Sequence, residues 1–283
     1  MHQLLMRPPS LLSTVPAPTH IPGEPDRRAR RIGPVVWSNA SDGGPGDGIA
    51  EGTDVDEKQD PWAVRRASLL ELARSAAEGG APLRGVNAYD AEAARDFRPS
   101  AVLLLFTPPR RGTEPDLFLV QRSRELRHHP GEIALPGGRL EPGEDAVAAA
   151  LRETHEEIGL HPAHVDVLGE LPAIMVPVTR YVVTPVLGWT DHAEEATHVE
   201  PGEVLHTIRV SVATLTDPER RRTVRIFGRR THGFLLPDGL VWGMTANLLD
   251  HVLAELGWAQ EWDASREVVM RRDADGRVWV PDL

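Results

Sequence analysis

Apolar runs along the chain predict a series of strands separated by loops. Residues 101–106 (AVLLLF) form a short unbroken apolar run, which is typical of a strand buried on both faces of a sheet. A loop at 108–114 separates this run from a second predicted strand at 116–121 (DLFLVQ). Further strands are predicted downstream, at 165–171, 182–189, 204–210 and 223–227.

Helical periodicity marks the segments between and around these strands. We expect helices at 61–79, within 138–160 and at 244–256, and a short one near 91–96. The first has an apolar set that we expect to pack outside the main domain or in a dimer contact: Trp62, Val64, Leu69, Leu70, Leu72 and Ala73. Helices on both faces of a mixed sheet predict an α/β fold, a three-layer α/β/α sandwich. A last hairpin is expected to pair 268–270 with 278–280 around Asp275-Gly276.

Composition divides the 283 residues unevenly. Residues 1–60 are rich in Pro, Gly, Ser and Asp and lack periodicity, so we expect a disordered extension. A basic stretch at 27–31 leaves an arm for an acidic partner as the alternative. We then expect a helical segment at 61–97, the main domain at 98–258 and a tail or small hairpin at 259–283.

Charge and cysteine content exclude several classes of protein. The net charge of −11 argues against a nucleic-acid partner, so an anionic substrate would need local basic residues or metal. With no cysteine, disulfide scaffolds and thiolate sites are excluded. Leucines near the N-terminus are interrupted by proline, and no apolar run reaches the length of a membrane span. We expect a soluble, cytoplasmic protein without a membrane partner.

The segment 138–160 (GRLEPGEDAVAAALRETHEEIGL) concentrates the candidate chemistry. Pro142 to Glu144 are expected to open a helix and Gly159 to close it. The helix buries an apolar stripe of Val147, Leu151, Thr154 and Ile158. Three carboxylates project from another face: Glu153, Glu156 and Glu157.

Such a cluster is self-repelling unless a cation is present. Mg²⁺ or Mn²⁺ would reverse the repulsion, because these hard cations prefer oxygen ligands and substrate phosphates. Arg152 and Glu144 flank the cluster and could orient it. The alternative is a solvated acidic face without chemistry.

The segment resembles the Nudix box, G-x5-E-x7-R-E-U-x-E-E-x-G-U, in which U is a bulky apolar residue. It matches at Gly138, Glu144, Arg152, Glu153, Glu156, Glu157, Gly159 and Leu160. Thr154 departs at the first U position, where its methyl can still pack. The resemblance implies the same sandwich and the hydrolysis of a nucleoside diphosphate linked to another moiety. It also implies divalent metal on Glu153, Glu156 and Glu157, and Arg152 among the catalytic residues.

A second stretch, FLVQRSRELRHHPGEIALPGG at 118–138, bears on the substrate. It resembles the motif upstream of the box in the coenzyme A pyrophosphatase branch, L-L-T-x-R-S-x3-R-x3-G-x3-F-P-G-G, with departures at Phe118, Val120 and Leu135. The substrate-binding residues that we expect from it are Arg122, Ser123, Arg127, Gly137 and Gly138. Arginines suit several phosphates, and glycines permit close backbone approach. The alternative is a solvated basic loop. Residues 241–249 also resemble that branch's closing helix.

The resemblance implies cleavage of coenzyme A, or acyl-coenzyme A, to 3′,5′-ADP and 4′-phosphopantetheine or its acyl form. The general base is left open between the box and a later glutamate, for which Glu203 and Glu200 are the candidates. Three alternatives stand. They are a Nudix hydrolase of another nucleotide such as ADP-ribose, a non-hydrolytic isomerase of this fold, and a ligand-binding regulator. A homodimer is also left open.

Overall fold

The computed structural model describes residues 62–125, 130–196, 202–226, 228–272 and 278–279. Contacts divide the chain into residues 1–56 and residues 57–283, and the account below concerns the second unit. The predicted disordered extension at 1–60 lies outside the described residues.

The large sheet is built around β1 (Arg98–Thr107), the strand that carries the predicted apolar run. It pairs in parallel with β7 (Tyr181–Trp189) and antiparallel with β2 (Asp116–Arg122) and β4 (Gly137–Arg139), so the sheet is mixed as predicted. Four more strands complete it: β3 (Ile133–Ala134) and β8 (Val204–Ser211) beside β2, and β5 (Asp166–Glu170) and β6 (Ile174–Val176) beside β7.

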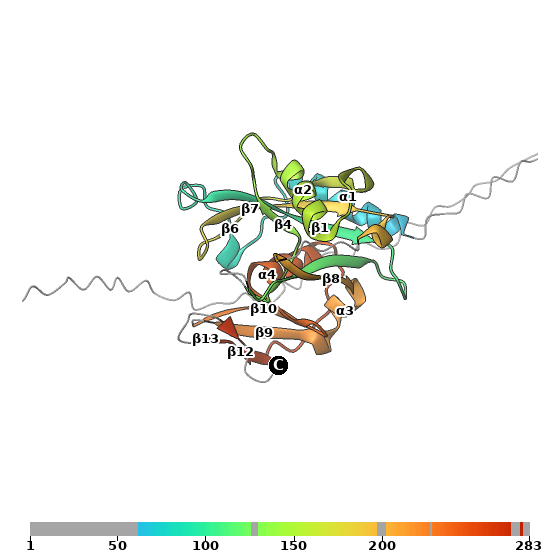
Figure 1. The fold of residues 1–283 in the computed structure, drawn as a ribbon. Helices are drawn as coiled ribbons and strands as arrows, with labels where there is room; N and C mark the ends of the chain where they lie inside the picture. Colours follow the sequence, from blue (N-terminus) through green and yellow to red (C-terminus); the bar gives the residue numbers. More distant parts are fainter. Residues whose placement is uncertain (1–61, 126–129, 197–201, 227, 273–277, 280–283) are drawn as a thin grey trace, which may run out of the picture. The chain divides into compact units, whose positions relative to one another are not determined.

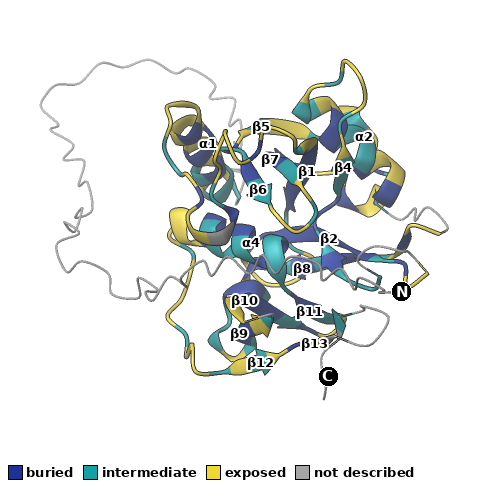
Figure 2. Ribbon diagram, turned by 90° about the vertical axis from the view of Figure 1, so that its left-hand side faces the viewer, coloured by how far each residue is buried: buried dark blue, intermediate teal, exposed yellow. Residues whose placement is uncertain are grey.

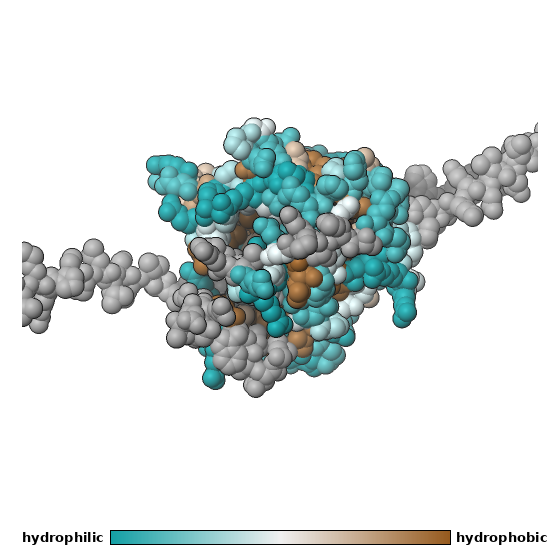
Figure 3. Space-filling view, in the orientation of Figure 1, coloured by the Kyte–Doolittle hydropathy of each residue, from teal (hydrophilic) through white to brown (hydrophobic). Residues whose placement is uncertain are grey.

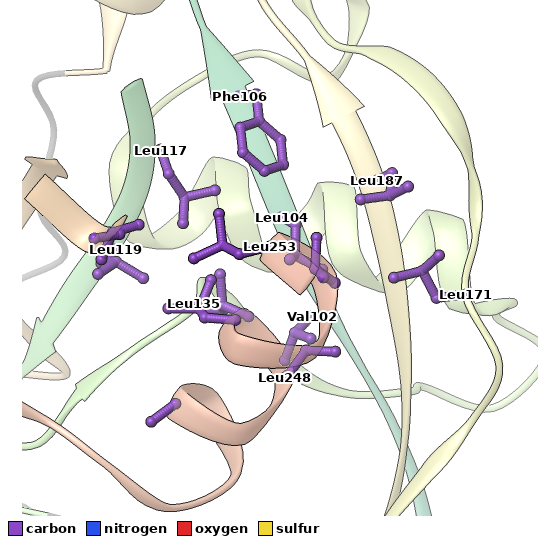
Figure 4. Packing of buried hydrophobic residues seen from close by; sticks show 14 of the residues in the cluster. Val102, Leu104, Phe106, Leu117, Leu119, Leu135, Leu171, Leu187, Leu248 and Leu253 are labelled. Carbon is purple, nitrogen blue, oxygen red and sulfur yellow. The ribbon is translucent and has the colours of Figure 1, made fainter. Parts of the chain in front are cut away.

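Alternate residues of β1 face two different cores. Ala101, Leu103 and Leu105 point into a cluster with α2 (Ala146–Ile158), the helix of the glutamate-rich segment. Val102, Leu104 and Phe106 point the other way, into a larger cluster with α1 (Ala63–Ala77) and α4 (Gly243–Glu255). Figure 4 shows Leu248 and Leu253 of α4 against this second face. The expected α/β/α layering is thereby confirmed.

Helix α1 covers β5 with only part of its predicted apolar face. Leu69, Leu72 and Ala73 are buried, whereas Val64 is 77% exposed and Leu70 41% exposed. Within a single chain the last two therefore lie on the solvent side of the helix, and the expected dimer contact stays a prediction. The exposed side of α1 is visible in Figure 2.

A second sheet, of which the sequence predicted two strands but not the pairing, lies beyond α4 (Figure 1). Its strand order is β11 (Gly239–Val241), β10 (Arg229–Leu236), β9 (Arg221–Ile226) and β12 (Glu267–Val269). Phe234, Leu236 and Val241 share a core with α4. Helix α4 is therefore buried on two sides, between the two sheets.

The predicted C-terminal hairpin is wrong in its pairing. Residues 267–269 add to β9 in parallel, and β13 (Arg271–Arg272) is the strand that pairs antiparallel with β14 (Val278–Trp279). The physical reason is the open edge of β9, which offers a longer partner than the short tail does. The expected turn at Asp275-Gly276 lies outside the described residues.

Short elements fill the connections. The helix expected near 91–96 is a run of turns, in which the Asp90 side chain accepts the N–H groups of Glu92 and Ala93. One short helix, α3 (Val212–Thr216), was not predicted. Single 3₁₀ turns are η1 (Gly85–Asn87), η2 (Pro162–His164), η3 (Ala193–Glu195) and η4 (Pro218–Arg220). No helix among the described residues is both long and apolar enough to cross a membrane.

Candidate active site

Helix α2 begins later than the sequence predicts. Asp145 is its N-cap and accepts the Ala148 N–H at 2.8 Å, so the helix starts at Ala146. Gly143 has a φ of 86°, a left-handed value that a helix cannot contain, and Glu144 closes a turn onto Glu141. The expected opening at Pro142–Glu144 is therefore wrong, whereas Gly159 ends the helix with a φ of 77° as predicted.

Thr154 is the polar residue in the buried apolar stripe of α2. Thr154 is fully buried, and its hydroxyl donates to the Ala150 carbonyl at 2.7 Å. This bond satisfies the hydroxyl inside the helix, while the methyl packs with Ile158 and its neighbours. Threonine at this position is thus compatible with the core.

Two glycines of β4 let the carboxylates of α2 approach the sheet closely. The Gly137 N–H donates to Glu157 Oε2 at 3.0 Å. A Cβ at Gly138 would lie 2.2 Å from Glu153 Oε1, and one at Gly137 would lie 2.3 Å from the Ala101 carbonyl oxygen. A side chain at Gly137 would collide with the backbone of β1, and one at Gly138 would displace the Glu153 carboxylate from its present position. The Gly-Gly pair therefore allows Glu153 and Glu157 to lie directly against β4.

Arg152 ties the remaining carboxylates of the segment together. Its guanidinium donates to Glu144 Oε1 at 3.0 Å and Oε2 at 3.1 Å, to Glu153 Oε1 at 3.0 Å and to Glu156 Oε2 at 3.2 Å. It also donates to the Arg139 carbonyl on β4 at 2.9 Å. Arg152 therefore fixes the helix to the strand and neutralises part of the cluster, in the position that the sequence indicates.

The two inner carboxylates hold their protons more tightly than usual. Burial raises the pKa of Glu157 to about 8; the Gly137 N–H opposes this rise, and the charge of Glu153 adds to it. Burial also raises the pKa of Glu153, although its hydrogen bond from Arg152 acts in the opposite direction. The charge of Glu203 contributes to both increases, and that of Arg122 lowers the pKa of Glu157.

Two of the predicted substrate-binding residues, Arg122 and Ser123, lie near the carboxylates of α2. The Ser123 N–H donates to the Glu203 carbonyl at 2.8 Å, which joins the end of β2 to the start of β8. Arg122 acts electrostatically on Glu157, and its Nε is buried with no hydrogen-bond partner among the described residues. Arg127 and Glu200, which the sequence also indicates, lie outside the described residues.

One basic group escaped the sequence analysis. Arg139 donates to the Tyr181 hydroxyl and lies over the Tyr181 ring, 5.5 Å from its centroid, while Arg98 lies 4.7 Å from the same centroid. Arg139 directly follows the Gly-Gly pair. Its position next to Gly138 in the sequence could have indicated Arg139. The proximity of Arg98 and Tyr181 could not be predicted in this way, because it depends on the pairing of β1 with β7.

The donor set suits a hard divalent cation. Glu153, Glu156 and Glu157 offer only carboxylate oxygens, and the raised pKa values of two of them reflect a burial and repulsion that a cation would relieve. Across the described residues, however, the three carboxylates do not converge within 4.8 Å as a group. One nitrogen of the Arg152 guanidinium donates to both Glu153 and Glu156, so these two carboxylates already share a cationic partner within the protein.

Comparisons with known proteins identify the family of the domain that carries these residues. The family model of the NUDIX domain matches residues 96–230. The uncharacterized Nudix hydrolase NudL of Escherichia fergusonii is 36% identical over 167 residues, which cover 57% of this chain and 84% of that protein. NudL of Escherichia coli K12 is 35% identical over the same length and the same shares of both chains. A solved MutT/nudix family protein from Enterococcus faecalis covers 73% of this chain and 75% of its own, with 17% identity and a TM-score of 0.42. The chain therefore belongs to the Nudix hydrolases and is a pyrophosphohydrolase.

Proposed function

We propose that the protein hydrolyses the diphosphate of coenzyme A or an acyl-coenzyme A, giving 3′,5′-ADP and 4′-phosphopantetheine or its acyl form. The observation that carries this proposal is the position of the upstream residues. Arg122 lies within electrostatic reach of Glu157, and Ser123 is bonded to the backbone of Glu203. The stretch that resembles the coenzyme A pyrophosphatase motif thus borders the box carboxylates.

Mg²⁺ or Mn²⁺ would be held by Glu153, Glu156 and Glu157. When bound, such an ion supplies charge withdrawal from the diphosphate and a more acidic water. Glu157 would enter this role by losing the proton that burial favours. Arg152 would keep Glu153 and Glu156 in position through the bonds it already makes.

Other residues of the chain would bind the substrate and move the proton. The buried Arg122 Nε–H, which lacks a partner among the described residues, is suited to a diphosphate oxygen. Glu203 is exposed beside the carboxylates and is a candidate general base. In this role it accepts the proton of the attacking water.

A second cationic group supports a substrate with a further phosphate. Arg98 and Arg139 lie over one tyrosine ring beside the box, and no ion pair to a carboxylate is found for either within the described residues. In a chain of net charge −11, two such arginines are unusual. They would suit the 3′-phosphate of coenzyme A.

Product analysis tests the proposal. Purified protein with Mg²⁺ is offered coenzyme A, ADP-ribose, NADH and nucleoside triphosphates, and the products are identified by mass spectrometry. We expect 3′,5′-ADP from coenzyme A with the highest kcat/KM of the panel. A higher kcat/KM for ADP-ribose than for coenzyme A would show that coenzyme A is not the preferred substrate. No turnover of any compound in the panel would contradict hydrolytic activity altogether.

A variant locates the substrate's outer phosphate. For Arg139→Ala we expect coenzyme A to lose about tenfold in kcat/KM, while dephospho-coenzyme A, which lacks the 3′-phosphate, changes little. Arg180→Ala is the matched control, because Arg180 stacks on Phe97 instead of Tyr181. Equal losses for both substrates would contradict a 3′-phosphate contact at Arg139.

A further inference from the structure

A second cluster of metal-ligating side chains lies away from the box carboxylates. His164 in η2, with His192 and Glu195 at η3, place one ligand atom each within 4.8 Å of one another. Glu195 bridges the two rings, with Oε2 at 2.6 Å from His164 Nδ1 and Oε1 at 3.1 Å from His192 Nδ1. The two imidazoles are stacked, with centroids 4.2 Å apart. We call these three residues the His-Glu cluster.

The backbone beneath the His-Glu cluster is held by one buried side chain. Thr190, 1% exposed, donates its hydroxyl to the His164 carbonyl at 2.7 Å. The same hydroxyl oxygen accepts the His192 N–H at 3.0 Å. One group thus fixes both histidine-bearing segments, although 28 positions separate them in the sequence (192 minus 164).

We propose that the His-Glu cluster binds one divalent transition-metal ion of the Zn²⁺ class. Two imidazole nitrogens and a carboxylate oxygen are a common ligand set for Zn²⁺, and they leave a fourth position for water. Neighbouring ligand atoms around a tetrahedral Zn²⁺ lie about 3.3 Å apart, which small side-chain rotations can reach from the present spacing. Mg²⁺ prefers oxygen ligands and many waters, so the two sites select different ions.

The cluster is open to an ion from solvent. The side chains of His164, His192 and Glu195 are 35%, 51% and 47% exposed. On the face drawn in Figure 3, the described residues are mainly hydrophilic, with separate apolar patches between them. The three side chains already contact one another, so an ion would replace a hydrogen-bonded arrangement with a coordinated one.

Binding would act on the segment that leaves the box helix. Turn η2 starts two residues after Leu160, the last residue of the box, and η3 follows the end of β7. A metal bond between His164 and His192 would join these segments and add to the link through Thr190. We therefore expect the ion to stabilise the protein without entering the hydrolytic reaction, and the inference does not rest on the proposed function.

Metal titration of the whole chain tests the inference. Protein stripped with a chelator is titrated with Co²⁺, followed by its visible absorption, and with Zn²⁺ in competition, with saturating Mg²⁺ present to occupy the box carboxylates. We expect one equivalent bound. His192→Ala and Glu195→Gln should each weaken the affinity about tenfold or more. Zn²⁺ should raise the Tm of the wild-type protein and not that of His192→Ala.

Two controls make the outcome decisive. His206→Ala removes a histidine that is paired with Asp238 at 3.1 Å and lies outside the His-Glu cluster, and Glu157→Gln alters the box. Both should bind Co²⁺ and Zn²⁺ as the wild type does. Unchanged affinity in His192→Ala and Glu195→Gln, loss of binding in Glu157→Gln, or no bound equivalent in the wild type would each overturn the proposal.

Discussion

Two buried ionisable side chains in this protein, Arg221 and Glu157, have opposite electrostatic surroundings. Arg221 of β9 is 1% exposed, forms an ion pair with Asp250 of α4 and lies between the rings of Phe234 and Trp262, at 4.3 Å and 4.9 Å from their centroids. Glu157 of α2 is 3% exposed and receives one backbone N–H at 3.0 Å, with a second carboxylate as its electrostatic neighbour.

The difference separates a structural charge from one that is arranged for chemistry. Around Arg221, an opposite charge and aromatic faces offset the loss of hydration, and the second sheet is thereby attached to α4. Around Glu157, neighbouring negative charge adds to the desolvation cost, which leaves the carboxylate with a raised pKa. Such a group contributes little to stability, and its surroundings suit a cation.

The largest expected effect is on turnover when Glu157 is changed. Glu157→Gln keeps an oxygen that can accept the Gly137 N–H but removes the negative charge. We expect kcat to fall about 10²–10⁴-fold at saturating Mg²⁺, with the folding midpoint unchanged or higher. Steady-state kinetics and thermal unfolding measure the two quantities on one preparation.

The control for this change is Glu255→Gln, an exposed glutamate on α4. It should alter neither kcat nor the midpoint. Near-wild-type turnover in Glu157→Gln would remove Glu157 from the catalytic set and weaken the contrast with Arg221.

The next effect is on stability when Arg221 is changed. Arg221→Met leaves the partly buried Asp250 with His232, at 3.3 Å, as its ion-pair partner among the described residues, so we expect a loss of about 3 kcal/mol in unfolding free energy. Chemical denaturation checks the value, and kcat per folded molecule should stay close to that of the wild type.

An exposed ion pair of the same chemistry is the matched control. Arg266 donates to both carboxylate oxygens of Glu219, at 2.6 Å and 2.7 Å, on the surface of the protein. Arg266→Met should move the midpoint far less than Arg221→Met does, because solvent screens the exposed pair. Equal effects would mean that burial does not set the role of Arg221.

The sequence predicts the surroundings of Glu157 better than those of Arg221. The run AVLLLF predicts β1. The spacing of the box places Glu153 and Glu157 one turn apart, and the structure shows that both carboxylates lie against the Gly-Gly pair of β4. A helical wheel, however, gives no information about the strand against which the helix packs. It could not show that Arg152 donates to Glu153 and Glu156 together, or that Gly143 delays the start of α2.

The surroundings of Arg221 depend on contacts between segments that are distant in the sequence. The stretch RRTHGFLL of β10 has no long apolar run, because Arg229 and Arg230 are exposed and His232 faces Asp250. The union of His164 with His192 likewise follows from the geometry of the segments that flank β5 and β7, which no local pattern encodes. Local patterns predicted the elements, and tertiary pairing determined which side chains meet.

The smallest expected effect is a dependence of stability on pH that Glu157 imposes in the absence of metal. Its pKa is raised to about 8 in the folded protein, whereas an ordinary glutamate in the unfolded chain titrates near 4.5. Between these values the folded state holds a proton that the unfolded state has released, so unfolding becomes easier as the pH rises. We expect a loss of about 2 kcal/mol from about pH 5.5 to about pH 7.5, measured by urea denaturation with a chelator present. Glu157→Gln cannot release this proton, so its stability should change less over the same range. A wild-type slope equal to that of the variant would mean that Glu157 is already ionised in the folded protein, and that its burial is compensated as fully as that of Arg221.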